Sequence, residues 1–170
     1  MNNSLKDLPL LLLGGLLIGL GCAGFFALSF SFGQLPPQAR FLDIFVPLVV
    51  LVFMLILIRA RRAERSFHFW EGLVSGNVML WIGGLISGLL IYLLAELKPE
   101  LFENFTSSSI RYLIEFNKQA AANQKVQNLD EQIRGLKELQ PSSMILDELW
   151  KKIFYSFFLV PLVSIVFRRK

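Results

Sequence analysis

The sequence predicts an all-α fold, an integral membrane four-helix bundle with an extramembrane helical insert between spans 3 and 4. The first observation is composition: 54% of the 170 residues are hydrophobic, 18% are charged, and the mean hydropathy is +0.55. Ordinary soluble domains are less apolar than this. The second is that four apolar stretches reach or approach the roughly 20 helical residues that cross a hydrocarbon core of about 30 Å.

These stretches divide the chain into three parts. Residues 1–97 carry the first three spans, at about 8–32, 41–58 and 67–95, and residues 149–170 hold the fourth span and a basic tail. Residues 98–148 form a polar segment outside the membrane. Uncharged runs cover residues 8–39, 44–58, 72–95 and 153–167, so we expect no ionisable group near the middle of any span.

The first span has features of a secretory signal, since Lys6 precedes it and a faint lipoprotein-like box precedes Cys22. A signal core has about 7 to 15 apolar residues, whereas this run is nearly twice as long. The residue three before Cys22 is Gly19, where such a box requires Leu. We therefore expect an uncleaved transmembrane helix. Cys22 is the only cysteine, and we interpret it as a small apolar packing residue.

Basic residues set the predicted orientation. The short connection after the second span contains four Arg and one Glu, and the chain ends in three basic residues. Short basic loops stay in the cytoplasm. Both termini are therefore predicted to be cytoplasmic and residues 98–148 periplasmic. The net charge of +4 then needs no nucleic-acid partner. These residues act as topology signals or contact lipid headgroups: Arg59, Arg61, Arg62, Arg65, Arg168, Arg169 and Lys170.

Small residues predict which spans pack together. On a helix, the glycines of the third span gather on one side and its bulky residues cover the other. Such a face lets two membrane helices approach closely. The first span has a matching row, so we expect spans one and three to pack closely, with Asn77 adding an interhelical hydrogen bond. Pro47 and Pro161 are expected to bend spans two and four. The packing residues are Gly15, Gly19, Ala23, Ala27, Gly72, Gly76, Gly83, Gly84 and Gly88.

The outer segment, residues 98–148, carries six basic and eight acidic residues. The cluster Thr106–Ser109 is a strong helix-start signal, and apolar residues then recur at three and four. Ser142 or Ser143 can begin the last helix, which enters the membrane near Trp150 and Lys152. The apolar stripe has three possible contacts, namely its own hairpin, the lipid headgroups or a partner protein. The candidate partner surface is Ile110, Leu113, Ile114, Phe116, Val126, Leu129, Ile133 and Leu136.

Residues able to carry chemistry are few. His68 is the only histidine, so neither a multi-histidine metal site nor a Ser-His-Asp site is predicted. No cofactor is implied. Glu71 and Asn77 are the candidate polar residues within the membrane. Glu71 also has a local interpretation, because it can pair with His68 or favour the start of its helix. Asp43 has the same helix-start interpretation.

Three stretches resemble a known family. They are the aromatic and glycine stretch Phe67–Gly76, the pair Lys98-Pro99, and LDELWKK at Leu146–Lys152, which is followed by an apolar run and terminal basic residues. Together they resemble the Bacteroidetes-type bacterial membrane family called domain of unknown function 4199, over nearly the whole chain. The resemblance implies an inner-membrane protein and supplies no activity. It also suggests membrane glycosyltransferases as a partner class.

The sequence is compatible with three functional hypotheses. The first is a non-enzymatic membrane subunit or assembly scaffold that binds a partner complex through its membrane helices and outer segment. The second is a small transporter or channel with Glu71 and Asn77 lining a path. The third and weakest is an accessory to a glycosyltransferase or an enzyme acting on lipid-linked substrates, in which the cluster Arg59–Arg65 binds a phosphate. The missing site chemistry favours the first.

Overall fold

The computed structural model describes residues 4–31, 42–61, 68–119 and 128–167. Every regular element in these ranges is a helix, so the predicted all-α class is confirmed. The order is α1 (Ser4–Ser31), α2 (Phe45–Arg61), α3 (Phe69–Leu97), α4 (Pro99–Gln119), α5 (Leu129–Lys137) and α6 (Ser143–Phe167).

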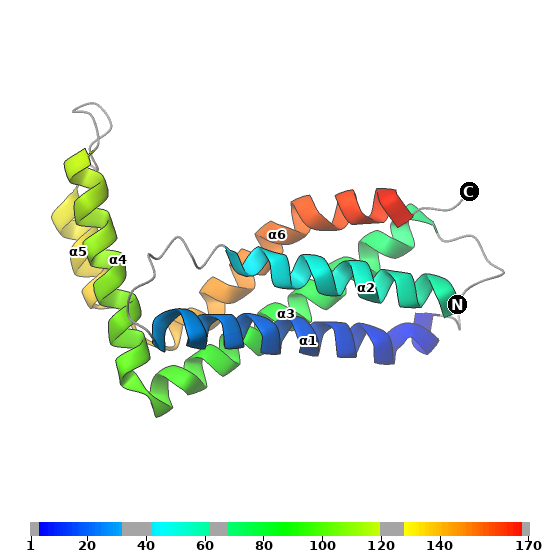
Figure 1. Cartoon of the computed structure of the whole chain (residues 1–170), viewed down its shortest axis with the longest axis horizontal. Coiled ribbons are helices and arrows are strands. Elements are labelled where there is room, and N and C mark those ends of the chain that lie inside the picture. The colour runs from blue at the N-terminus through cyan, green and yellow to red at the C-terminus, as the bar shows by residue number, and fades with distance from the viewer. Residues whose placement is uncertain (1–3, 32–41, 62–67, 120–127, 168–170) are drawn as a thin grey trace.

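The four long helices lie side by side as a bundle, and α4 and α5 stand across one of its ends (Figure 1). α1, α2, α3 and α6 are each long and apolar enough to cross a membrane, over Asp7–Ser31, Leu42–Arg61, Phe69–Leu97 and Ser143–Phe167. The four predicted spans are therefore confirmed. The start of α1 and the end of α6 lie at the end of the bundle opposite α4.

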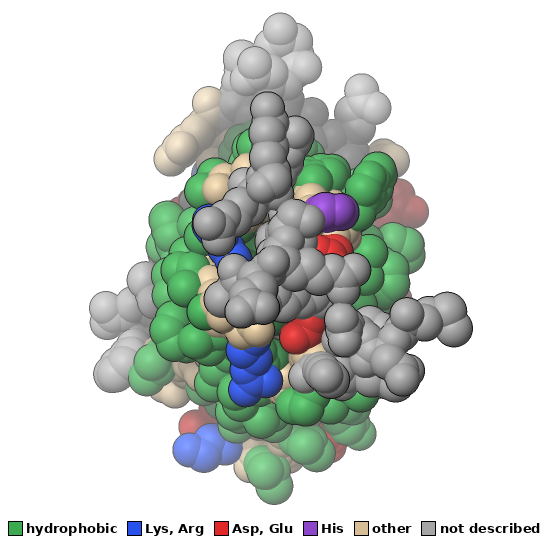
Figure 2. Space-filling view, turned by 90° about the vertical axis from the view of Figure 1, so that its right-hand side faces the viewer, with side chains coloured by type: hydrophobic (Ala, Val, Ile, Leu, Met, Phe, Trp, Pro, Cys, Tyr) green, Lys and Arg blue, Asp and Glu red, His purple; other side chains and the backbone are tan. Residues whose placement is uncertain are grey.

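The outside of the bundle is apolar. Figure 2 views the end opposite α4 and shows hydrophobic side chains around its rim. Large side chains project outward along the spans; Trp81, for example, is 49% exposed and Phe157 is 72% exposed. Surfaces of this kind are stable against lipid tails rather than water. The exposed residues therefore support contact with a lipid bilayer.

α3 passes into α4 through a single residue. The Lys98 backbone N–H donates to the Leu94 carbonyl at 2.9 Å and closes the last turn of α3. Pro99 then starts α4, a position that suits proline because its missing N–H has no helical partner there. The chain thus turns sharply where it leaves the bundle, and α4 runs across the end of α1 and α3.

The base of α4 is fixed to the bundle by an aromatic cluster. The ring of Phe105 lies 5.4 Å from that of Phe30 in an edge-to-face arrangement and 6.1 Å from that of Phe26. Leu101 and Phe105 are both buried. The Asn104 side-chain amide also donates to the Phe30 carbonyl at 3.2 Å, which satisfies an acceptor at the end of α1. α4 is therefore an anchored part of the fold.

One local prediction was wrong, and the two predicted proline bends stay predictions. The Thr106–Ser109 cluster does not start a helix, because α4 begins at Pro99 and runs through it. Inside α4, the hydroxyls of Ser107, Ser108 and Ser109 donate to backbone carbonyls three or four residues earlier, as serine does inside helices. Pro47 lies in the first turn of α2, where a missing N–H does not require a bend. Pro161 lies inside α6.

Candidate functional site

Small residues of α1 face branched side chains of α3. A Cβ built on Gly15 would lie 2.5 Å from Ile82 Cγ2, and one on Gly19 would lie 2.5 Å from Ile86 Cγ2. Gly83 of α3 faces Ile18 of α1 at 2.5 Å in the same way. None of these glycines can gain a side chain without moving its neighbour. The first and third spans therefore pack closely, as their small residues predict.

The other glycines of α3 face α6 instead. A Cβ on Gly76 would lie 2.6 Å from Val160 Cγ1, one on Gly84 would lie 3.2 Å from Lys152 Cβ, and one on Gly88 would lie 2.8 Å from the Ile145 backbone. The glycines of α3 thus contact two neighbouring helices. The sequence predicted that they pack on the first span, whereas Gly76, Gly84 and Gly88 pack on α6. Gly72 and Ala23 are buried, and Ala27 is half-buried.

α6 presents a row of buried residues four positions apart, and part of it is polar. Side chains spaced by four lie on one face of a helix. Glu148, Lys152 and Ser156 begin the row, and Val160 and Ser164 continue it; none is more than 3% exposed. Gly84 and Gly76 of α3 lie against this row. Charged side chains are therefore held inside the α3–α6 contact.

Two residues of this row, Glu148 and Lys152, form a closed cycle of ion pairs with Asp43 and Lys151. These four residues are called the charge ring. Lys152 Nζ lies 2.7 Å from Asp43 Oδ2 and 3.2 Å from Glu148 Oε2. Lys151 Nζ lies 2.8 Å from Asp43 Oδ2 and 2.6 Å from Glu148 Oε1. Each lysine thus bridges both carboxylates, and the positive and negative charges balance.

The charge ring is buried. The side chain of Lys152 is 0% exposed, those of Asp43 and Glu148 are 3% and 1% exposed, and Lys151 reaches 10%. Neutral polar groups complete it: the Tyr155 hydroxyl donates to Asp43 Oδ1 at 3.0 Å, and the Ser87 hydroxyl to Glu148 Oε2 at 3.4 Å. The second, third and fourth spans therefore contribute to one polar centre.

The depth of the ring follows from helix lengths at 1.5 Å rise per residue. Counting toward the end opposite α4 gives about 22 Å from Lys152 to Phe167 and about 24 Å from Asp43 to Arg59. The count from Gly84, which packs on Lys152, to Phe69 also gives about 22 Å. Measured from these helix ends, the ring lies within the length of a hydrocarbon core of about 30 Å and nearer its α4 side. The sequence did not predict that Asp43 and Lys152 meet there in a buried ring.

Apolar clusters lie on both sides of the ring. The larger one includes Ile18, Leu51, Met54 and Leu80 and fills the bundle toward the end opposite α4. The other includes Phe26, Phe30, Ile91, Phe105 and Met144, and α4 contributes to it directly. Removing one member from a buried ion pair in such surroundings typically costs about 3–5 kcal/mol, because it leaves an uncompensated charge. The ring is therefore stable only while its positive and negative charges balance.

The two predicted polar candidates do not belong to this centre. Glu71 lies at the start of α3, where its carboxylate accepts the His68 backbone N–H at 3.0 Å. That contact matches the local helix-start interpretation. The Asn77 amide donates to the Leu73 carbonyl of its own helix at 2.8 Å. The expected interhelical bond is therefore replaced by one within α3.

The basic residues are described only in part. Arg59 and Arg61 form the last turn of α2, at the end of the bundle opposite α4. Arg62, Arg65, Arg168, Arg169 and Lys170 lie outside the described residues. Their predicted topology or headgroup role stays a prediction.

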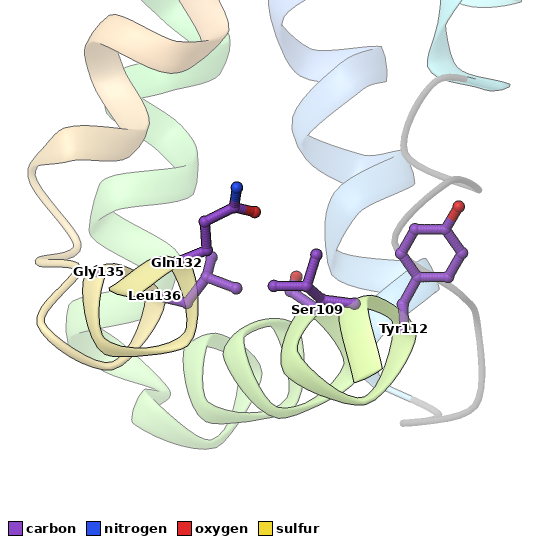
Figure 3. Close-up of a pocket in the computed structure, with 6 residues that line it drawn as sticks. Ser109, Tyr112, Gln132, Gly135 and Leu136 are labelled. Atoms are coloured by element: carbon purple, nitrogen blue, oxygen red, sulfur yellow. The ribbon is translucent and has the colours of Figure 1, made fainter. Parts of the chain in front are cut away.

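The predicted outer stripe is divided between α4 and α5, which pack together as a hairpin. Ile110, Leu113, Ile114, Leu129, Ile133 and Leu136 are half-buried, Phe116 is exposed, and Val126 lies outside the described residues. A groove of about 370 Å³ runs between the helices, lined by Ser109, Tyr112 and Leu113 of α4 and by Gln132, Gly135 and Leu136 of α5 (Figure 3). The packing of α4 on α5 therefore leaves part of the apolar stripe exposed to solvent.

Comparison with known proteins identifies a family. The family described as "Protein of unknown function (DUF4199)" matches residues 13–169. A search of curated proteins and a search of solved structures each found no match. The match covers most of the first span, the other three spans and the outer hairpin, and it names no activity.

Proposed function

The chain belongs to the DUF4199 family of proteins of unknown function, and we propose that it is a non-enzymatic membrane subunit or scaffold that holds a partner complex at its outer hairpin. The observation that carries this proposal is the open groove between α4 and α5. In this proposal the bundle lies in the bacterial inner membrane, as the family resemblance implies, and the basic connection after the second span supports a periplasmic hairpin.

The groove has the properties of a docking surface. Its walls are mostly apolar, with the hydroxyls of Ser109 and Tyr112 and the amide of Gln132 supplying hydrogen-bonding groups. A Cβ added at Gly135 would meet nothing within 4 Å, so the groove is open at this point. A protein interface typically combines buried apolar anchors with a few polar groups in this way.

The hairpin is also held in place before any partner binds. Phe105 and Asn104 fix the base of α4 to α1, and only Lys98 separates α3 from α4. A preorganised surface loses less conformational freedom on binding. The partner class suggested by the family resemblance is a membrane glycosyltransferase, which is therefore the first candidate to test.

The test fills the groove without disturbing the bundle. Gly135→Phe places a ring in the open space and replaces a poor helix former. Lys137→Phe is the matched control, because position 137 is exposed and lies about 200° around α5 from position 135. Tagged chains are extracted from their native membrane in mild detergent, and co-purifying proteins are quantified by mass spectrometry.

We expect a stoichiometric partner with the wild-type chain and with Lys137→Phe, and its loss with Gly135→Phe. A wild-type chain that purifies without any stoichiometric partner would refute the proposal. Equal retention of the partner by both variants would remove the groove as its binding surface.

A further inference from the structure

The charges of the ring come unequally from the helices that form it. α6 contributes Glu148, Lys151 and Lys152 to the ring, and these three residues carry one excess positive charge, while Asp147 of the same helix is exposed. α2 contributes Asp43 at the start of its span. An uncompensated charge at this depth is costly. Within the buried ring, the excess positive charge of the α6 residues is balanced by Asp43.

Asp43 is bound by α6 as completely as a carboxylate ligand would be. Its Oδ2 atom forms an ion pair with Lys151 Nζ at 2.8 Å and accepts a hydrogen bond from Lys152 Nζ at 2.7 Å. Its Oδ1 atom accepts from the Tyr155 hydroxyl at 3.0 Å. Hydrogen bonds to charged groups are shorter and stronger than neutral ones. One residue at the start of the second span, just before α2, thus makes three contacts with α6.

α2 depends on these contacts more than the other spans would. In the most apolar 18 residues of the second span, 33% of the residues are buried. The corresponding share is 44% in α1 and α3 and 39% in α6. Apolar packing between helices gains little in a membrane, because lipid tails offer similar contacts. α2 is therefore the span that packing alone holds least.

We infer that the charge ring is an interhelical lock that sets the position of α2: Asp43 docks α2 on α6, and the docked state is the one in which the α6 charges are tolerated. Because its charges balance, the ring is suited to holding helices together rather than to carrying a mobile charge. Buried polar groups are known to specify helix pairing in this way in other systems.

The fold provides a reporter for the docking of α2. A Cβ at Gly21 of α1 would lie 3.8 Å from Val46 Cβ of α2, which is about the mean Cβ separation of a disulfide. A second pair leaves α2 out, since a Cβ at Gly76 of α3 would lie 3.4 Å from Val160 Cβ of α6. Each added Cβ is closest to the valine side chain that the paired cysteine replaces.

The experiment measures the rate of disulfide formation in membranes, in a Cys22→Ser background. One chain carries Gly21→Cys with Val46→Cys, and the control chain carries Gly76→Cys with Val160→Cys. Asp43→Asn is then added to each. We expect it to slow the α1–α2 disulfide at least roughly tenfold, equivalent to about 1.4 kcal/mol of lost docking free energy, and to leave the α3–α6 disulfide unchanged.

An unchanged α1–α2 rate with Asp43→Asn would overturn the lock. If Asp43→Asn slows both disulfides, the whole bundle has loosened. The double variant Asp43→Leu with Lys152→Met then separates charge from packing, because its remaining Glu148–Lys151 pair is electrically balanced. Recovery of the α3–α6 disulfide in that double variant supports a lock based on charge. No recovery would show that Asp43 acts through packing and would refute it. The outcome needs no partner protein and is independent of the groove.

Discussion

Gly88→Ala is the sharpest test of the close contact between α3 and α6. The added methyl carbon would lie 2.8 Å from Ile145 Cα and 2.9 Å from its carbonyl oxygen. Both atoms belong to backbone, so no side-chain rotation can relieve the clash. Carbon atoms normally meet at about 3.5–4.0 Å. α3 and α6 must therefore separate by several tenths of an ångström at this point.

The separation has two costs. A gap of about 0.5–1 Å removes a quarter to a half of the dispersion energy of the atoms that line it. It also lengthens the Ser87–Glu148 hydrogen bond, which is already 3.4 Å, and so weakens the support of the charge ring. Overpacking of a tight contact typically destabilises a protein by about 1–3 kcal/mol. We expect a loss of this size for the clash itself.

Gly24→Ala is the matched control. It lies in α1, and a Cβ there would meet nothing within 4 Å. Both substitutions replace glycine inside a helix, which gains up to about 1 kcal/mol of helix propensity in each case. The difference between the two variants therefore isolates the clash, and we expect it to be about 1–3 kcal/mol. Unfolding in mixed micelles by increasing dodecyl sulfate, followed by circular dichroism, measures it. Equal unfolding of the two variants would refute the close backbone contact.

Three further outcomes are expected. Glu148→Gln leaves two lysines facing one carboxylate and should lower the unfolding free energy in the same assay by about 3–5 kcal/mol, whereas a loss within error would show that the ring is hydrated. Asn77→Leu should change it by no more than about 0.5 kcal/mol, since the amide bonds within its own helix, and a large loss would indicate an interhelical partner. Ser108→Cys in a Cys22→Ser background should react with an impermeant thiol reagent added to intact spheroplasts, and protection there would reverse the predicted orientation.

Long-range apolarity made the spans predictable. Each of the four helices carries an uncharged run that reaches or approaches the length needed to cross the hydrocarbon core, and this signal is strong in a single sequence. The contact between α1 and α3 was also readable, because Gly15 and Gly19 recur at the four-residue spacing of one helix face. Gly76, Gly84 and Gly88 were harder to assign, since a small residue shows that something comes close without showing which helix does.

The charge ring was missed because its members were judged singly, by their distance from the edge of a span. Asp43 and Lys152 are 109 residues apart in the chain, and no local pattern links them. A signal was nevertheless present in α6: Glu148, Lys152 and Ser156 recur every four residues within a helix that is otherwise largely apolar. A polar row on one face of a membrane helix faces protein rather than lipid, which predicts a buried partner such as Asp43.

α6 joins the hairpin to the charge ring. Its second residue, Met144, packs in the outer apolar cluster with Phe105 of α4, and Glu148 lies about one turn further along the same helix. A displacement of the hairpin base would therefore have to break the aromatic contacts of Phe105 and tilt the first turns of α6, which hold the ring. Since a broken ring leaves unpaired charge in the membrane, the ring resists that motion. The buried charge ring therefore helps to keep the base of the outer hairpin rigid. A rigid hairpin loses less conformational entropy when a partner binds in its groove.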